Sequence, residues 1–265
     1  LRMNRMNQSP KTNRQDITCH KTLRGHPTGV YKLMTISRDD LLNVIQKLID
    51  KFFNQKIYNA EIPESLNGAL LVTNHISRLD VVFLMLSTKR KDVIALTASN
   101  YRRALFFGTI LKKLGVIWLD RGESDFKAMR ETADYLKKGW IVGLAPEGRR
   151  SRSGKLIKAK PGAVLIAMKT GVPIIPVGLV GTADMGKAIR KWRKMDVTIK
   201  FGEAFYLPER EENEHNRDYV ERALDEIMCR IAVLIPEEQR GFYANHPRLK
   251  SLLAEIEEKK NATES

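Results

Sequence analysis

The chain has 265 residues, of which 43% are hydrophobic, and its mean hydropathy of −0.33 describes a globular protein with a sizeable core. This length suits one large domain with appended segments and excludes a small module stabilised only by disulfides or metals. The 46 Lys and Arg against 31 Asp and Glu give a net charge of +15, which favours anionic partners such as phosphorylated metabolites, nucleic acid or an acidic membrane surface. Aromatic residues do not interleave with basic ones and no zinc-knuckle spacing occurs, so we expect no nucleic-acid partner.

The cysteines and the apolar runs indicate the cellular compartment of the protein. Cys19 and Cys229 are far apart and match no metal-binding or redox spacing, which favours a reducing compartment. No run approaches the ~20 apolar residues that a bilayer span needs, and residues 1–33 have no apolar stretch typical of a signal peptide. We therefore expect a cytoplasmic protein that is either free or peripheral on the cytosolic face of a membrane.

The first part of the chain is basic and then amphipathic. Residues 1–33 carry seven Lys or Arg against the single acid Asp16, which predicts a disordered basic tail. Met34 precedes the first helical period, and we expect the functional protein to begin near it. Residues 37–60 are predicted to form an amphipathic helical arm, with apolar residues at helical spacing at Leu41, Leu42, Val44, Ile45, Leu48, Ile49, Phe52 and Phe53.

The basic side chains Lys47, Lys51 and Lys56 lie beside this apolar stripe. A basic amphipathic helix that ends in two phenylalanines suits a lipid interface, with Phe52 and Phe53 inserted. The alternative is a helix that packs on its own domain, as most amphipathic helices do.

The middle of the chain, residues 61–208, is predicted to be one α/β domain with a mixed central sheet flanked by helices, because short apolar runs alternate with helical periods. The predicted strands are 68–73, 92–97, 115–119, 140–145, 173–180 and 196–201. The predicted helices are 78–88, 102–113, 124–138 and 161–170. Residues 209–265 are predicted to form a C-terminal helical extension, with one helix that Pro236 stops and another at about 247–259.

The segment from Asn74 to Asp80 directly follows the apolar run 69–72, where a strand should turn into a helix. Ser77 and Asp80 have the spacing of a capping box. Five residues on a continuous helix would put two side chains roughly 140° apart, so His75 can meet Asp80 only by folding over the first turn. A carboxylate on one imidazole nitrogen leaves the other free to take a proton from an alcohol. The alternative is a helix cap with a neighbouring histidine.

Three further segments have residue types that suit a site. The strand of residues 115–121 ends in Asp120 and Arg121, which suits either a phosphate contact or a surface ion pair. Residues 145–151, Ala-Pro-Glu-Gly-Arg-Arg-Ser, follow a buried strand and combine a glycine with two guanidinium groups, as in an anion pocket or a solvated basic loop. Residues 172–177 carry two prolines on a β-rich run, which we interpret as structural.

Taken in order, these four segments resemble the motifs of the glycerolipid acyltransferases, the family of lysophosphatidate and glycerol-3-phosphate acyltransferases. The resemblance covers roughly residues 66–205. Asn74, His75 and Asp80 match the family's Asn-His-x-x-x-x-Asp motif, and the other three segments are similar to its second, third and fourth motifs. Two residues depart from the pattern: Ala145 stands where phenylalanine is usual, and Arg149 stands where threonine is common. The second departure changes the charge of the presumed phosphate pocket and leaves the identity of the acceptor open.

The resemblance implies an acyltransferase that moves a fatty acyl group from an acyl thioester to the free hydroxyl of 1-acyl-glycerol-3-phosphate, giving phosphatidic acid for phospholipid biosynthesis. It implies that His75 is the general base and that Asp80 orients it. It implies no metal and no cofactor, since the thioester of coenzyme A or of acyl carrier protein is a co-substrate. We expect backbone amides near Gly148 to stabilise the oxyanion. The implied acceptor-binding residues are Arg121, Gly148, Arg149 and Arg150, together with Glu147, which positions nearby groups.

Two alternatives stay open. The acceptor could be glycerol-3-phosphate or another lysolipid. The chain could also be a binder of anionic lipid that keeps the fold without the reaction. Under the main interpretation, the expected partners are a lysophospholipid, an acyl thioester, an anionic membrane surface and acyl carrier protein.

Overall fold

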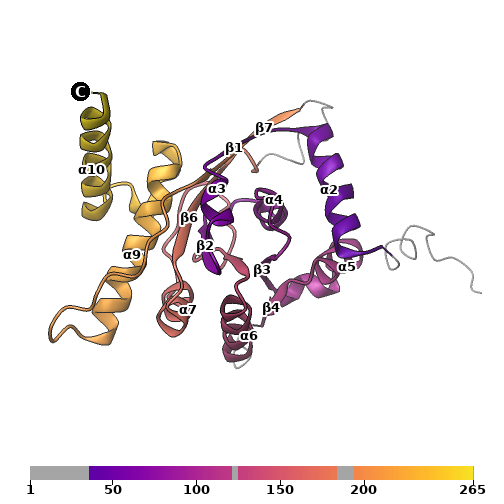
Figure 1. Cartoon of the computed structure of the whole chain (residues 1–265), viewed down its shortest axis with the longest axis horizontal. Helices are drawn as coiled ribbons and strands as arrows, with labels where there is room; N and C mark the ends of the chain where they lie inside the picture. Colours follow the sequence, from indigo (N-terminus) through magenta and orange to yellow (C-terminus); the bar gives the residue numbers. More distant parts are fainter. Residues whose placement is uncertain (1–35, 121–124, 184–193, 265) are drawn as a thin grey trace, which may run out of the picture.

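The protein is seen here as a computed structural model that describes residues 36–120, 125–183 and 194–264. The tail predicted for residues 1–33 and the site residue Arg121 lie outside the described residues. A seven-stranded sheet in the order β1-β7-β6-β2-β5-β3-β4 lies between two layers of helices (Figure 1). β6, β2, β5, β3 and β4 are parallel to one another, whereas β7 runs antiparallel to β6 and β1 pairs parallel with β7. The predicted mixed α/β sheet flanked by helices is confirmed.

The elements appear in the following chain order, with two further short 3₁₀ turns at Glu237–Gln239 and Gly241–Tyr243. They are α2 (Arg38–Phe52), β1 (Phe53–Tyr58), α3 (Glu61–Glu64), β2 (Ala69–Thr73), α4 (Asp80–Leu86), β3 (Val93–Ala98), the 3₁₀ turn η1 (Ser99–Arg103), α5 (Leu105–Leu114), β4 (Ile117–Leu119), α6 (Asp125–Lys137), β5 (Ile141–Leu144), α7 (Gly162–Thr170), β6 (Ile174–Val180), β7 (Met195–Phe201), α9 (Asn216–Leu234) and α10 (Pro247–Glu264). The six predicted strands and most of the predicted helices are therefore present, with shifted ends.

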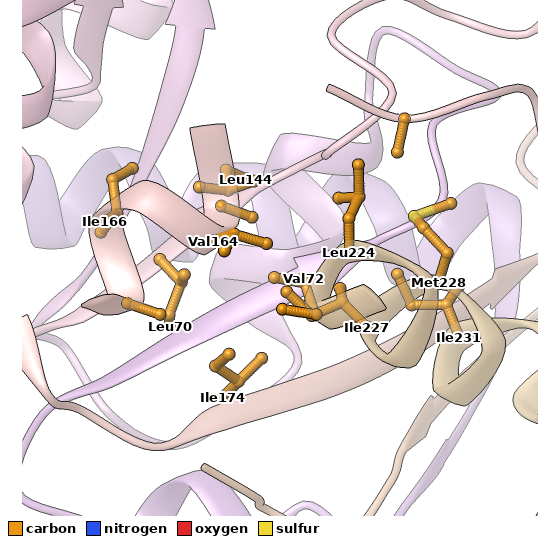
Figure 2. Packing of buried hydrophobic residues seen from close by; sticks show 14 of the residues in the cluster. Leu70, Val72, Leu144, Val164, Ile166, Ile174, Leu224, Ile227, Met228 and Ile231 are labelled. Atoms are coloured by element: carbon orange, nitrogen blue, oxygen red, sulfur yellow. The ribbon is translucent and has the colours of Figure 1, made fainter. Parts of the chain in front are cut away.

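The central strand β2 is buried on both faces, as a continuous apolar run in a parallel sheet predicts. Successive side chains of a strand point to opposite faces. Leu70 and Val72 accordingly pack with residues of α6, α7 and α9, and Figure 2 shows this cluster. Ala69 and Leu71 pack with residues of α2, α4 and α5 on the other face. The sheet thus separates two hydrophobic cores.

The predicted C-terminal extension is helical, but its first helix completes the core of the α/β unit. In α9, Ala223, Ile227 and Ile231 are fully buried in the same cluster as β2. The helix lies close to β6, because a Cβ at Gly178 would come within 2.7 Å of the Cβ of Leu234. Helix α9 is therefore an integral part of the α/β body.

The helical arm predicted for residues 37–60 is only partly correct. Ser37 caps α2 by accepting a hydrogen bond from the amide of Asp40 at 3.1 Å, but the helix ends at Phe52. Residues 53–58 form the edge strand β1, whose backbone pairs with β7 from Met195 onward. Phe53 is 5% exposed and its ring meets the ring of Phe83 edge-on at 5.2 Å, so it belongs to the core and not to a lipid interface.

Two other predicted boundaries differ for local reasons. The helix predicted at 78–88 spans only Asp80–Leu86, because the hydroxyl of Ser77 accepts from the amide of Leu79 at 3.2 Å and not from that of Asp80. Asp80 does reach back to the amide of Ser77, so half of the predicted capping box is present. The strand predicted at 115–119 begins at Ile117, since Gly115 adopts a left-handed conformation, with φ of +74°, that ends α5.

Candidate active site

The candidate site lies where three parallel strands of the sheet end. His75 follows β2, Glu147 follows β5 and Thr182 follows β6, and β2 lies between the other two in the sheet. Parallel strands present their carboxyl ends at one edge, which is where open α/β folds place their sites. Three residues that are far apart in the chain therefore lie at the same edge of the sheet.

The side chains of His75 and Asp80 are in contact. Nδ1 of the imidazole lies 2.9 Å from Oδ2 of the carboxylate, and the expected folding of the histidine over the first helical turn is confirmed. Because an ionised carboxylate only accepts, the neutral imidazole carries its proton on Nδ1. Nε2 makes no hydrogen bond to any described residue. With 20% of the His75 side chain exposed, this nitrogen is the free, basic end of the pair.

Asp80 is 2% exposed, and both of its carboxylate oxygens accept hydrogen bonds. Its Oδ2 also accepts from the amides of Ile76 at 2.8 Å and Ser77 at 2.7 Å. Its Oδ1 accepts from the hydroxyl of Thr182 at 2.7 Å. A carboxylate held by four donors has no freedom to turn away from the imidazole. Thr182 is fully buried and was missed by the sequence reasoning, although its place after the strand-ending Gly181 was a signal.

Asn74, the first residue of the motif, has a structural role in this fold. Its side-chain amide donates to the carbonyl of Leu179 and accepts from the amide of the same residue, both at 2.8 Å. The side chain thus extends the pairing of β2 with β6 beyond the last backbone hydrogen bond. This contact fixes the point at which the chain leaves the sheet and begins the loop that carries His75.

Glu147 holds the backbone of His75. One carboxylate oxygen accepts from the amide of His75 at 2.9 Å and the other from the amide of Ile157 at 3.1 Å. The carbonyl of His75 accepts from the amide of Ser151 at 2.7 Å, so the loop after β5 binds both sides of this residue. Glu147 is 1% exposed, and both of its oxygens already bind backbone amides. These contacts give Glu147 a positioning role at the backbone of His75.

Burial also changes the acidity of Glu147. Loss of solvation raises its pKa to about 7, against the opposing effect of the hydrogen bonds from His75 and Ile157. A protonated carboxyl would present one hydroxyl to an amide and so lose one of the two acceptor contacts. The hydrogen bonds by which Glu147 positions the backbone of His75 therefore depend on pH near neutrality.

Gly148, Arg149 and Arg150 form an exposed rim next to the Ser151 contact with His75. Gly148 has a φ of +65°, which explains the glycine at this position. Its amide donates to the carbonyl of Ala145 at 3.0 Å, so among the amides near Gly148 this one is already occupied. The amides of Arg149 and Arg150 make no hydrogen bond within the described part of the chain. The structure brings these three residues together with His75, whereas the position of Arg121 is not described.

Another histidine–aspartate pair, with a cysteine beside it, lies between α9 and α10. Sγ of Cys229 is 3.4 Å from Nδ1 of His246, and Nε2 of His246 is 3.3 Å from Asp225. The thiol is fully buried, and burial raises its pKa to about 12, so it is not a nucleophile at neutral pH. Nδ1 of His246 also accepts from the amide of Arg248 at the start of α10. The arrangement is structural, and Cys229 packs in the hydrophobic core.

No helix in the described ranges is both long enough and apolar enough to cross a bilayer. Across the same ranges, no group of three or more His, Cys, Asp or Glu side chains is arranged to hold a metal ion.

Comparison with known proteins assigns the class of this α/β unit. A family model described as Acyltransferase matches residues 54–180. The matched residues include the loop from Asn74 to Asp80 and the rim that follows β5.

The names of the aligned relatives specify a reaction within this class. A chloroplastic 1-acyl-sn-glycerol-3-phosphate acyltransferase of Brassica napus is 34% identical over 137 residues, which are 51% of this chain and 39% of that protein. A 1-acyl-sn-glycerol-3-phosphate acyltransferase of Bacillus subtilis is 26% identical over 59% of this chain and 77% of its own length. A crystal structure of the 1-acyl-sn-glycerophosphate acyltransferase PlsC from Thermotoga maritima covers 74% of this chain and 84% of its own, at 24% identity and a TM-score of 0.49. The match with the plant relative thus spans well under half of that protein.

Proposed function

We propose that the protein is a 1-acyl-glycerol-3-phosphate O-acyltransferase that forms phosphatidic acid from a lysophosphatidate and an acyl thioester. The observation that carries the proposal is the 2.9 Å contact between His75 and Asp80, in which Nε2 has no partner among the described residues and a basic rim lies beside it. The match of residues 54–180 to the Acyltransferase family model and the names of the aligned relatives support the reaction and the acceptor.

The reaction uses His75 first as a base and then as an acid. Nε2 takes the proton of the acceptor hydroxyl while that oxygen forms a bond to the thioester carbonyl carbon. Asp80 stabilises the imidazolium that results, without taking its proton. The tetrahedral oxyanion then collapses and the carbon–sulfur bond breaks. The departing sulfur takes the proton back from Nε2, which leaves an ester, a free thiol and the starting form of His75. A positioned base of this kind contributes roughly 10²–10⁴-fold to the rate.

The acceptor phosphate is assigned to the basic rim. The guanidinium groups of Arg149 and Arg150 are exposed and make no hydrogen bond or ion pair within the described residues. Planar guanidinium forks bind phosphate oxygens in pairs, and an unpaired one is available for this purpose. Arg121 joins this cluster in the proposal on the basis of its motif alone. The backbone amides of Arg149 and Arg150 are the proposed donors to the oxyanion, since that of Gly148 is occupied.

The donor and the location are further parts of the proposal. The acyl group arrives as a thioester of coenzyme A or of acyl carrier protein, and no cofactor or metal takes part. Lysophosphatidate resides in a bilayer, and the net charge of +15 favours attraction to an anionic surface. We therefore place the working protein on the membrane surface, facing the cytosol.

The test is an assay of product by mass spectrometry with each candidate acceptor and donor. The wild-type chain should convert 1-acyl-glycerol-3-phosphate to phosphatidic acid, and His75→Ala should lose roughly 10²–10⁴-fold in kcat with an unchanged circular dichroism spectrum. His215→Ala is the matched control, because His215 lies outside the site, before α9. Conversion of glycerol-3-phosphate or another lysolipid in its place would support the alternative acceptors. Lipid binding without any acyl transfer would support the non-enzymatic alternative.

A further inference from the structure

Three exposed apolar side chains lie shortly after the carboxyl ends of two neighbouring strands. β3 and β4 pair with each other at one side of the sheet, and α5 and α6 begin shortly after their carboxyl ends (Figure 1). At these helix starts, Leu105 is 92% exposed, Phe106 62% and Phe126 81%. Leu105 is the most exposed of the large hydrophobic residues in the described ranges. Single exposed apolar residues are common, but three at the same edge of one sheet mark an interaction surface.

The fold holds this apolar tip, defined as Leu105, Phe106 and Phe126, on rigid elements. A Cβ at Gly108 would lie 2.5 Å from the carbonyl oxygen of Tyr101 and 2.8 Å from that of Arg102. The glycine therefore allows α5 to fold directly back on the η1 turn. The ring of Tyr101 packs edge-on against Phe107 at 5.7 Å, which anchors the same corner from inside. Leu105 and Phe106 are thus displayed by a tight, packed corner.

The two parts of the tip approach the edge from opposite faces of the sheet. Further along α5, Leu111 and Leu114 are buried in the core on the α2 and α4 side. Further along α6, Ala128 and Leu136 are buried in the core on the α7 and α9 side. The exposed first turns of both helices therefore flank the same carboxyl edge of β3 and β4, one on each side.

Positive charge borders the apolar tip. Arg102 and Arg103 are exposed and directly precede it, and neither has a carboxylate partner among the described residues. The guanidinium of Arg102 stacks over the ring of Trp118 on β4 at 5.1 Å, which keeps this charge next to the tip. Apolar side chains bordered by basic ones are the pattern of a surface that inserts into an anionic lipid interface.

The tip is also linked to the candidate site. The guanidinium of Arg78, within the loop that carries His75 and Asp80, lies 5.9 Å from the ring of Tyr101 in η1. The carboxyl ends of β3, β4, β2 and β5 share one edge because these strands are parallel. A bilayer that contacts the tip would therefore lie against the edge where the proposed lipid acceptor must enter.

We propose that Leu105, Phe106 and Phe126, with Arg102 and Arg103, form the surface by which this protein docks on an anionic bilayer. The inference rests on the proposed function, because it explains how the site reaches a membrane-resident acceptor. It assigns docking to the corner between η1 and α5 and to the start of α6, in place of the apolar stripe of α2. The charge of the arginines draws the surface to the bilayer, and the apolar side chains hold it there.

The experiment measures binding of the full chain to vesicles of phosphatidylcholine with and without phosphatidylglycerol. Leu105→Ser/Phe106→Ser should weaken binding to the anionic vesicles by about tenfold or more, because two exposed apolar groups no longer insert. Arg102→Gln/Arg103→Gln should weaken binding roughly fivefold per charge at low salt and little at high salt. The matched control is Tyr206→Ser: Tyr206 is 66% exposed and adjoins Phe205, which pairs with the first residue of β6 at the opposite edge.

Rates on two forms of the acceptor separate docking from chemistry. Leu105→Ser/Phe106→Ser should turn over a dispersed short-chain acceptor at the wild-type rate and lose activity on a vesicle-embedded one. His75→Ala should bind vesicles like the wild type. If the wild type transfers no acyl group to any acceptor but the vesicle-binding results are as stated, the proposed function is wrong and the docking surface stands.

Three outcomes would overturn the docking surface. The first is wild-type vesicle binding by the Leu105/Phe106 variant, and the second is an equal loss in the Tyr206 control. The third is a change of the variant from dimer to monomer on size exclusion with vesicle binding intact, which would assign the surface to a second copy of the chain.

Discussion

The backbone amide of His75 donates a hydrogen bond to Glu147 at 2.9 Å, so the proposed base is held by a carboxylate from the end of a different strand. The amide of Ser151 holds the carbonyl of His75 in turn. Glu147 is almost completely buried, with both oxygens bound to backbone amides. Its influence on the reaction therefore passes through the position of His75.

Glu147→Gln should lower kcat with little change in KM. An amide side chain can accept at only one oxygen and would direct its NH₂ group at the amide of either His75 or Ile157. A displacement of the base by about 1 Å can cost roughly 10²-fold in rate. The measurement is steady-state kinetics on a dispersed acceptor, with the exposed Glu212→Gln as the control. A rise in KM at constant kcat would instead return Glu147 to the acceptor-binding residues.

The pH profile gives an independent test of the same contact. Because burial raises the pKa of Glu147 to about 7, the wild-type kcat should fall as the pH drops through this value and one acceptor is lost. Glu147→Gln should lack this part of the profile. Identical profiles for the wild type and the variant would contradict the role of Glu147 ionisation.

The same pKa predicts how stability depends on pH. The native state binds the Glu147 proton more tightly than the unfolded state, whose pKa is near 4.5. This contribution to the free energy of unfolding is complete below pH 4.5 and is lost as the pH rises through about 7. The full difference is roughly 3 kcal/mol. Urea unfolding of the wild type and Glu147→Gln at pH 5 and 8 should show it, and a constant difference between the two proteins would refute it.

Thr182→Val should destabilise the protein and slow the reaction. The substitution keeps the shape but removes the only donor to Oδ1 of Asp80 among the described residues, inside a fully buried site. A buried acceptor that loses its partner costs about 1–3 kcal/mol. Thr182→Ser keeps the hydroxyl and should restore most of the loss in kcat. Equal losses for the serine and valine variants would show that the methyl group, and not the hydroxyl, matters.

The contribution of Asp80 to the reaction can be separated from its contribution to folding. Asp80→Asn keeps the size of the side chain but removes the charge that stabilises the imidazolium and selects the tautomer. We expect kcat to fall roughly 10²–10⁴-fold. Circular dichroism and urea unfolding at the assay pH would establish that the variant is folded. A folded variant with nearly wild-type kcat would remove Asp80 from the mechanism.

Local patterns made the central part of the fold predictable. The apolar run 69–72 predicts a buried strand, and β2 is buried along its whole length. Gly171 predicts a helix end, and α7 ends there. The edge strand β1 was missed because Asn54, Gln55 and Lys56 show no alternation of apolar and polar residues. Its partner β7 begins at Met195, and pairing between such distant segments leaves no local signal.

The same distinction separates the predicted and the missed parts of the site. His75 and Asp80 are five residues apart, so their contact follows from the geometry of one turn. The contacts of Glu147 with His75 and of Thr182 with Asp80 join residues 72 and 102 positions apart. Only the order of strands in the sheet brings these residues together, and spacing in the sequence does not reveal that order.

The final prediction concerns which residues of the first helical stripe carry stability. Phe53→Ala should lower the free energy of unfolding by about 3–5 kcal/mol, because a buried ring packed on Phe83 is replaced by a cavity. Leu48 lies on α2 and is 53% exposed, so Leu48→Ala should change stability by no more than about 0.5 kcal/mol. Urea unfolding of both variants measures this difference. A larger loss for Leu48→Ala than for Phe53→Ala would mean that α2 packs through its other face, and the assignment of Phe53 to the core would then be wrong.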